Sequence, residues 1–293
     1  MGRVTRRRLL IGGAATVVAG AAGFTYGEVA EILPGHTQFR QYFGLDGADG
    51  TVPDVPVSVT MEHEQSAARG VGVQVAVMSP AGMSRAGLPV VVVLHGRSGS
   101  AQGMVDLGFP QFLTAAVRAG VAPFVLVAPD GGDNTYWHAV ASHGHRDDPQ
   151  AMLLNELPAW LSKYGLSPSP TGAIGISMGG FGALLYARNR RTAGTALASV
   201  AAISPAIFQD WPDASTVGTF ADQADWAANE PLQHVSALAG ERCGIWCGGD
   251  DPFHDAAQAF ARELPATTSQ FAPGAHDDGY WRRVLPDALR FLG

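Results

Sequence analysis

Short apolar segments alternate with amphipathic segments along most of the chain, and this alternation constrains the fold more than any other feature. Continuous apolar runs of strand length occur in "LPVVVVLHG", "APFVLVAPD", "TGAIGIS", "LASVAAIS" and "RCGIWCGG", as expected of strands covered on both faces. Helical spacing of apolar residues occurs between them, in "PQFLTAAVRAG", "PQAMLLNELPAWLSKYG", "MGGFGALLYARN" and "DAAQAFARELP". The alternation predicts an α/β fold, with a mostly parallel sheet covered by helices on both faces.

The domain organisation follows from the stretches outside this alternation. Residues 25–55 are rich in Gly, Pro and Asp without a sustained period, which predicts an extended lead-in. "VSVTMEHE" and "VGVQVAVMS" then alternate as half-buried strands do, so the folded domain is expected over residues 56–293. Residues 205–240 mix tryptophans and acids without a strong period and are predicted to form a small, irregular, cap-like insertion.

The first 24 residues have the pattern of an export signal. "VTRRRLLIGGAATVVAGAAGF" has a basic start and then an apolar run that is short for a membrane span, which needs about 20 apolar residues. The order of residues 5–10 matches the twin-arginine pattern. Residues 1–24 are therefore predicted to be a twin-arginine-type signal segment of an exported protein, either secreted or in the cell envelope. An uncleaved anchor is the alternative.

The charge of the chain excludes several classes of partner. The formal net charge is −7, and it becomes −11 without the signal segment, because that segment holds four arginines and no acid. Nucleic-acid binding is not expected of so acidic a protein. Lys163 is the only lysine, so a Gly-Lys-Ser/Thr phosphate loop is absent and nucleotide-driven functions are excluded.

A candidate nucleophile lies in "AIGISMGGFGALLYA", residues 173–187. Ser177 occupies a Gly-x-Ser-x-Gly motif there, although a lone match can arise by chance in a chain with 37 glycines. The motif lies at the carboxyl end of a predicted strand and before a predicted helix, where catalytic groups gather in open α/β sheets. Ser177 is therefore predicted to be a nucleophile on a strained strand-to-helix turn.

A serine nucleophile requires a base and an acid that orients the base. Among the histidines downstream of Ser177, His276 stands in "PGAHDDGYW", a Gly-flanked loop before the last helix, and is the predicted base. His254 opens a helix and His234 lies in the cap region, so they are expected to serve capping or surface roles.

The acid is expected in "GIWCGGDDPFHD", after the preceding strand. Asp251 is predicted, since the following proline favours an extended backbone that turns the carboxylate inward. Asp250, Asp210 and Asp213 are the alternatives.

Two further groups complete the predicted site. The backbone N–H groups of Met178 and of Arg97, which lies in "VVVLHGRSGS", are the expected oxyanion donors. The alternative is that His95-Gly96 in this loop forms only a tight turn. "DGGDNTYWHAV" places Tyr136, Trp137 and His138 on a loop expected to line the substrate pocket; packing of the loop is the alternative.

No metal or other cofactor is predicted. In "HAVASHGHRDD", three histidines and two aspartates have spacings compatible with metal ligation, namely His138, His143, His145, Asp147 and Asp148. Loop histidines beside acids are more often solvated, and a triad needs no metal.

Six ordered blocks resemble one family. "LHGRSG", "PDGGDNTYWHA", "MLLNELPAWL", "GISMGGFGAL", "CGGDDPF" and "GAHDDGYW" are similar to the esterase D group of α/β-hydrolases, which includes antigen 85-type mycolyltransferases. The resemblance runs from about residue 70 to the C-terminus. It implies an α/β-hydrolase fold and cleavage or transfer of acyl esters. The implied nucleophile, acid and base are Ser177, Asp251 and His276, with Arg97 and Met178 as oxyanion donors.

Two departures argue against mycolyl transfer itself. The mycolyltransferases use glutamate as the acid, and they have an acidic "DG" where this chain has "LHGR". The sequence therefore predicts an exported serine esterase that hydrolyses small-molecule or lipid acyl esters through an acyl-enzyme. An acyltransferase that uses a sugar or alcohol acceptor is one alternative. A non-catalytic cell-envelope binding protein on the same fold is the other.

Overall fold

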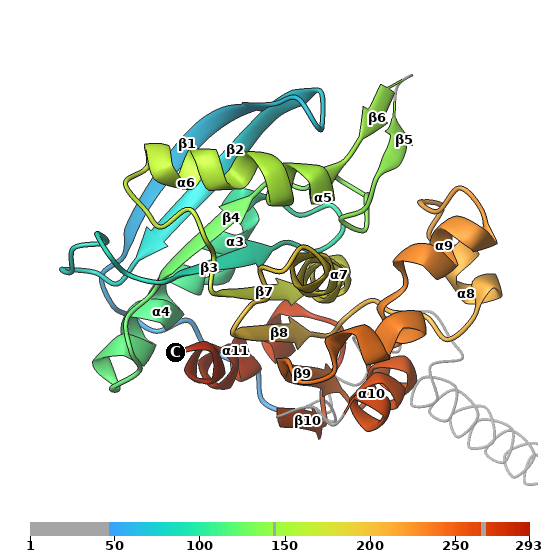
Figure 1. Cartoon of the computed structure of the whole chain (residues 1–293). Coiled ribbons are helices and arrows are strands. Elements are labelled where there is room, and N and C mark those ends of the chain that lie inside the picture. Colours follow the sequence, from blue (N-terminus) through green and yellow to red (C-terminus); the bar gives the residue numbers. More distant parts are fainter. Residues whose placement is uncertain (1–46, 143–144, 265–267) are drawn as a thin grey trace, which may run out of the picture. The chain divides into compact units, whose positions relative to one another are not determined.

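An eight-stranded sheet forms the centre of the protein (Figure 1). The computed structural model describes residues 47–142, 145–264 and 268–293, and residues 49–293 form one unit. The predicted signal segment, residues 1–24, and most of the predicted lead-in lie outside the described residues. The end of the lead-in, residues 47–55, contains neither helix nor strand.

The sheet is mostly parallel, as predicted. Its order is β1-β2-β4-β3-β7-β8-β9-β10; β2 pairs antiparallel with β1 and β4, and the other neighbours pair in parallel. The strands are β1 (Ser58–Ser66), β2 (Val71–Ser79), β3 (Val90–Leu94), β4 (Val125–Pro129), β7 (Gly172–Ile176), β8 (Ser199–Ile203), β9 (Arg242–Gly248) and β10 (Thr268–Ala272).

The central strands are buried on both faces because helices cover each side of the sheet. Val90, Val92 and Leu94 belong to one core, while Val91 and Val93 belong to the other, since successive strand side chains point to opposite faces. The first core is covered by α6 (Leu157–Lys163), α7 (Met178–Thr192) and α10 (His254–Glu263), and the second by α3 (Ala101–Leu107), α4 (Phe109–Arg118) and α11 (Asp278–Leu292). Figure 1 shows α4 and α11 on the opposite side of the sheet from α6.

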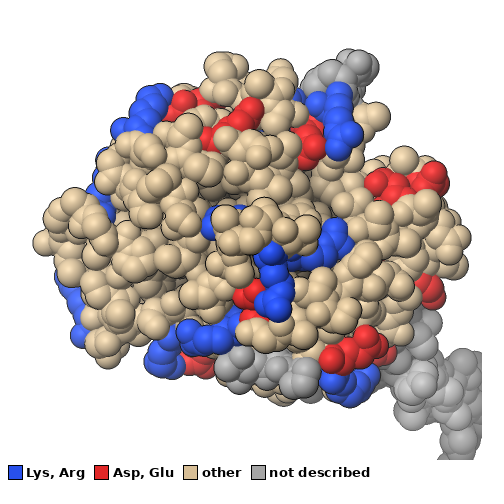
Figure 2. Space-filling model, viewed as in Figure 1, with Lys and Arg blue, Asp and Glu red and all other residues tan. Residues whose placement is uncertain are grey.

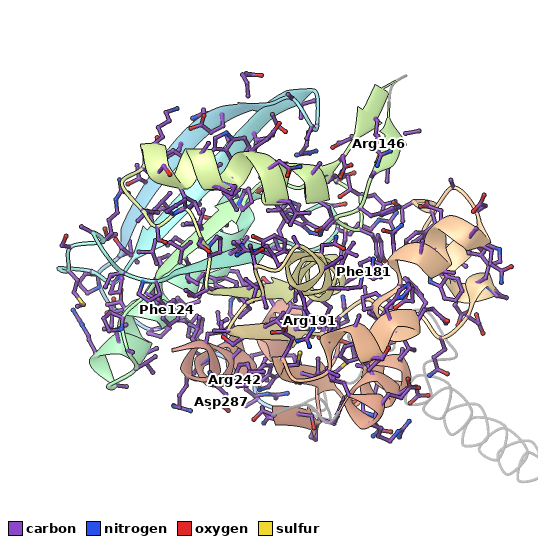
Figure 3. The ribbon with its side chains drawn as sticks, in the orientation of Figure 1. Phe124, Arg146, Phe181, Arg191, Arg242 and Asp287 are labelled. Atoms are coloured by element: carbon purple, nitrogen blue, oxygen red, sulfur yellow. The ribbon has the colours of Figure 1, made fainter. Side chains whose placement is uncertain are left out.

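The amphipathic segment 149–165 is not one regular α-helix. It comprises α5 (Pro149–Ala151), a π-helical segment η1 (Met152–Glu156) and α6. Pro158 has no N–H to donate to the preceding turn, which accounts for the altered ladder before α6. Two further elements were not predicted, namely α3 and the hairpin formed by β5 (Val140–Ser142) and β6 (His145–Asp147). Arg146, labelled in Figure 3, lies on this hairpin.

Residues 205–240, predicted to be a cap-like insertion, contain short helices: α8 (Trp211–Ser215), α9 (Gln223–Asn229) and the 3₁₀ segment η2 (Pro231–Leu238). Glu230 is fully buried among them. Its carboxyl accepts hydrogen bonds from the N–H groups of Phe208 (3.1 Å) and Leu232 (3.1 Å) and from the indole of Trp226 (3.0 Å). Burial raises the pKa of Glu230 to about 8. These bonds hold the chain that follows β8 against α9 and η2.

Charged side chains are interspersed with uncharged ones on the face shown in Figure 2, and its described residues form no continuous basic surface. None of the helices in the described residues combines the length and apolar character needed to cross a membrane.

Candidate active site

Ser177 lies on a sharp turn between β7 and α7. Its φ of 56° and ψ of −123° place a residue with a side chain in a sparsely populated backbone region. The neighbouring glycines make this turn sterically feasible. A Cβ on Gly175 would lie 1.9 Å from the carbonyl oxygen of Gly179, and a Cβ on Gly179 would lie 1.9 Å from that of Leu94. The Gly-x-Ser-x-Gly pattern is thus required by close backbone approach as well as by the turn.

Three predicted residues meet in one hydrogen-bonded chain. The Ser177 hydroxyl lies 2.8 Å from Nε2 of His276, and Nδ1 of His276 lies 2.8 Å from Oδ2 of Asp251. Because a carboxylate can only accept, Nδ1 carries the proton and Nε2 is left to accept from the serine. This is the arrangement by which a base removes a proton from a hydroxyl.

The topology of the sheet explains this meeting. Ser177 follows β7, Asp251 follows β9 and His276 follows β10. These strands are parallel, with β8 between β7 and β9. Their carboxyl ends therefore lie at the same edge of the sheet, where residues distant in sequence converge.

Asp251 is held as an anion in a buried position. It is 4% exposed, and its Oδ1 accepts a 2.9 Å bond from the N–H of Phe253. Burial alone would raise the pKa of Asp251, but the hydrogen bond and charge of His276, together with hydrogen bonds from Ser204 and Phe253, hold this pKa below its ordinary value. A carboxylate with a lowered pKa is suited to stabilising an imidazolium.

The alternative acids lie elsewhere. Asp250 is half-buried, and its N–H donates to the carbonyl of Gly274 (2.9 Å). Asp210 caps α8 by accepting from the N–H of Asp213 (3.1 Å), and both are exposed.

The alternative bases have other partners. Nδ1 of His254 contacts the carbonyl of Gly248 (2.9 Å), and Nε2 of His234 contacts that of Ala227 (2.9 Å). The hydrogen bonds therefore bring together Ser177, His276 and Asp251.

Two backbone N–H groups flank the serine. Met178 begins α7, so its N–H is among those that a helix leaves unpaired. The loop after β3 approaches closely at Gly96, where a Cβ would lie 3.3 Å from the Cβ of Ser177. The next N–H is that of Arg97, and within the described part of the chain neither it nor the N–H of Met178 has a protein acceptor. Both are available to an oxygen beside Ser177.

A cavity of 480 Å³ adjoins the serine and the histidine. Its wall is largely apolar, formed by Met104, Leu107, Ile176, Val217, Phe253 and Trp281. Arg97, Tyr136 and Asp278 add polar groups. An apolar cavity with few polar groups suits the acyl or alcohol part of an ester.

Only one of the three residues predicted to bind substrate lines this cavity. Tyr136 does so, and its ring packs edge-on against Phe181, labelled on α7 in Figure 3, with centroids 5.3 Å apart. Trp137 instead lies in the core between Gly131 and Gly182, where a Cβ on either glycine would come within 2.4 Å of the indole. His138 is also buried, with its ring stacked on Phe220 at 4.9 Å.

The prediction that Trp137 and His138 line the pocket is therefore corrected. Tyr136 and Trp137 have φ values of 48° and 57°, so this loop does not alternate its side chains between core and pocket as extended backbone does. Nε2 of His138 lies 3.4 Å from a carboxylate oxygen of Asp225 in α9. Trp137 and His138 thus anchor the Tyr136 loop to α7 and α9.

The histidines and acids of residues 138–148 are not assembled as a metal site in the described residues. Asp147 pairs with Arg69 through two bonds of 2.8 and 2.9 Å. Asp148 caps α5 by accepting from the N–H of Ala151 (2.9 Å). His143 lies outside the described residues.

Sequence reasoning missed three residues around the histidine and the acid. Ser204 follows β8, donates a hydrogen bond to Asp251 and accepts one from the indole of Trp281 (3.1 Å). Trp281 and Phe253 pack edge-on against the ring of His276, with centroids 5.2 and 5.3 Å away. Ser204 ends an apolar strand run just as Ser177 does, and this signal could have placed it at the same sheet edge.

Comparisons with known proteins identify the family and the fold of this chain. A family model described as "Putative esterase" matches residues 66–292. Curated protein sequences gave no match.

Solved structures of similar fold include a ferulic acid esterase, with a TM-score of 0.68 and 19% identity, covering 81% of this chain and 98% of that one. The S-formylglutathione hydrolase (FrmB) of Staphylococcus aureus has a TM-score of 0.62 and 17% identity, covering 81% and 99%. MPT51 (FbpC1) of Mycobacterium tuberculosis has a TM-score of 0.60 and 18% identity, covering 82% and 100%.

These structures confirm the predicted α/β-hydrolase fold. The family model spans most of the chain. The chain therefore belongs to the esterase family and is a carboxylic ester hydrolase.

Proposed function

We propose that the protein is an exported serine esterase that cleaves acyl esters through a Ser177–His276–Asp251 triad and an acyl-enzyme. The observation that carries this proposal is the pair of 2.8 Å contacts joining Ser177 to His276 and His276 to Asp251. The cavity beside Ser177 provides room for a small-molecule or lipid ester. The basic and apolar pattern of residues 1–24 supports export by the twin-arginine route and a secreted or cell-envelope location.

The reaction begins when Oγ of Ser177 attacks the ester carbonyl and its proton passes to Nε2 of His276. Asp251 stabilises the resulting imidazolium and keeps the ring in the tautomer that accepts at Nε2. The carbonyl oxygen becomes negative and is bound by the N–H groups of Arg97 and Met178. His276 then protonates the alcohol oxygen as the ester bond breaks. The alcohol departs, and the acyl group stays bound to Ser177.

Water completes the cycle by the same groups. His276 removes a proton from the water as it attacks the acyl-enzyme, and the oxyanion again forms between Arg97 and Met178. Collapse of this second tetrahedral species releases the carboxylic acid and returns the proton to Ser177. No cofactor takes part.

A p-nitrophenyl ester series of increasing acyl length tests the proposal, with glycerol or trehalose added in parallel reactions. We expect the wild-type protein to release nitrophenol and the free acid as the main products, and the Ser177→Ala variant to fall to background. Absence of turnover for every ester would contradict the proposal. If acylated glycerol or trehalose were the main product, the protein would be an acyltransferase instead.

A further inference from the structure

His95 directly follows β3, next to the Gly96–Arg97 peptide that borders Ser177. It is 1% exposed, and no step of the proposed reaction uses it. Burying an imidazole costs free energy unless both of its nitrogens form hydrogen bonds. The hydrogen-bond partners of His95 therefore indicate which backbone groups it positions.

The partners of His95 fix its tautomer. Nδ1 lies 2.8 Å from the carbonyl oxygen of Gly96, and Nε2 lies 2.8 Å from the backbone nitrogen of Gly131. A carbonyl only accepts and a backbone N–H only donates. Nδ1 therefore carries a proton and donates to Gly96, while Nε2 is unprotonated and accepts from Gly131. Burial lowers the pKa of His95, which keeps the ring in this neutral form.

The bond to Gly96 sets the direction of the Arg97 N–H. The carbonyl of Gly96 and the N–H of Arg97 belong to one planar trans peptide, so they point in opposite directions. The same carbonyl accepts a second bond, 3.0 Å long, from the N–H of Gly99. Turning the peptide over would break both bonds and would direct a carbonyl oxygen, rather than an N–H, towards the oxyanion.

Neighbouring groups hold His95 itself in place. The indole N–H of Trp137 donates to the backbone carbonyl of His95 (3.1 Å), and the two rings pack with centroids 5.1 Å apart. A Cβ on Gly99 would lie 3.2 Å from Nδ1 of His95, so glycine there lets the loop close over the ring. The Gly131 N–H binds the opposite side of the ring, so the histidine bridges the loops that follow β3 and β4.

We propose that His95 is a positioning residue for the oxyanion site: its Nδ1–H holds the Gly96–Arg97 peptide so that the Arg97 N–H faces the carbonyl oxygen of the substrate. The inference rests on the proposed function of Ser177 and of the Arg97 N–H. It assigns His95 no contact with the substrate and no proton transfer.

A matched pair of variants separates the two bonds of the ring. In His95→Asn, the side-chain amide nitrogen occupies the position of Nδ1 and retains the donor to Gly96, but the acceptor for Gly131 is lost. In His95→Gln, the longer side chain places its amide oxygen near Nε2 and retains the acceptor for Gly131, but the donor to Gly96 is lost. Both variants replace the buried ring with a smaller amide, so their packing losses are similar.

We expect His95→Gln to lose about 100-fold in kcat, by comparison with removal of one oxyanion donor, while KM changes less than threefold. His95→Asn should retain at least a tenth of the wild-type kcat. A trifluoromethyl ketone, which forms a tetrahedral adduct with the serine, should lose affinity for His95→Gln in parallel with kcat/KM. Melting temperatures check that both variants are folded.

Equal losses of kcat in two folded variants, or wild-type kcat and ketone affinity in His95→Gln, would overturn the positioning role. If His95→Gln does not fold, His95→Asn decides alone: a folded Asn variant that has lost 100-fold in kcat contradicts the inference, and one that retains a tenth supports it. Wild-type turnover that depends on Ser177 upholds the proposed function whatever the His95 variants do. Failure of the two ideas is therefore distinguishable.

Discussion

Replacing His276 with alanine should lower kcat by about 10⁶, because the serine and histidine of a triad act as a unit. Without the imidazole, the Ser177 hydroxyl has no base at 2.8 Å, and the departing alcohol has no acid. KM should change much less than kcat, because the cavity wall and the oxyanion donors remain. Steady-state kinetics on a p-nitrophenyl ester measure both quantities.

His254→Ala provides the matched control. His254 lies close in sequence to Asp251, but its Nδ1 contacts the carbonyl of Gly248 (2.9 Å) and its ring packs on Phe271. We expect its kcat to stay within a few-fold of the wild-type value. A mild effect of His276→Ala beside a severe effect of His254→Ala would show that the base is misassigned.

The same assignment sets the sign of the pH dependence. The base must be neutral imidazole, so kcat/KM should rise as pH increases and more of the base is unprotonated. The pKa of Asp251 is held below its ordinary value, so this carboxylate stays ionised at neutral and weakly acidic pH. Asp251 therefore adds no second step there, and its stabilising contribution is lost only in stronger acid, as pH falls through the lowered pKa.

Asp251→Asn should lower kcat by about 10⁴, following the precedent of triad aspartate substitutions. The carboxylate accepts the Nδ1 proton of His276 at 2.8 Å. An amide in its place can donate to Nδ1, which stabilises the tautomer that has its proton on Nε2. That tautomer cannot accept the proton of Ser177. The site would keep its shape and still lose its base.

Asp250→Asn tests the adjacent position with the same chemical change. Asp250 lies one residue from the acid, and its backbone N–H binds Gly274. Asparagine keeps this backbone bond, and Nδ1 of His276 contacts Asp251 instead, so we expect little change in kcat. Both variants should be compared in kcat and in melting temperature. A large loss of turnover in Asp250→Asn, with Asp251→Asn near wild type, would reverse the assignment of the acid.

The sheet and the meeting of Ser177, His276 and Asp251 were predictable because each depends on local pattern and chain order. Continuous apolar runs identified the central parallel strands, which must be apolar throughout when both faces are covered. The Gly-x-Ser-x-Gly motif at a strand end located Ser177. Chain order then limited the candidate bases and acids to a few residues. The proline after Asp251 favoured that aspartate over Asp250.

Side-chain direction in the irregular loops was not predictable in this way. Tyr136 lines the cavity while Trp137 and His138 are buried in the core, because two successive residues have positive φ and no simple period applies. The role inferred for His95 depends on the orientation of one peptide plane, which the sequence does not encode locally. The partnership of Ser204 with Asp251 depends on β8 lying between β7 and β9, which requires the sheet order.

Covalent labelling of the nucleophile tests the central assignment most directly. The wild-type protein is treated with a fluorophosphonate, and the adduct is located by peptide mass spectrometry, with Ser177→Ala treated in parallel. We expect one adduct per chain, on Ser177, and none in the Ser177→Ala protein. An adduct on Ser98 or Ser204, or labelling of Ser177→Ala at the wild-type rate, would contradict the assignment of Ser177 as the nucleophile.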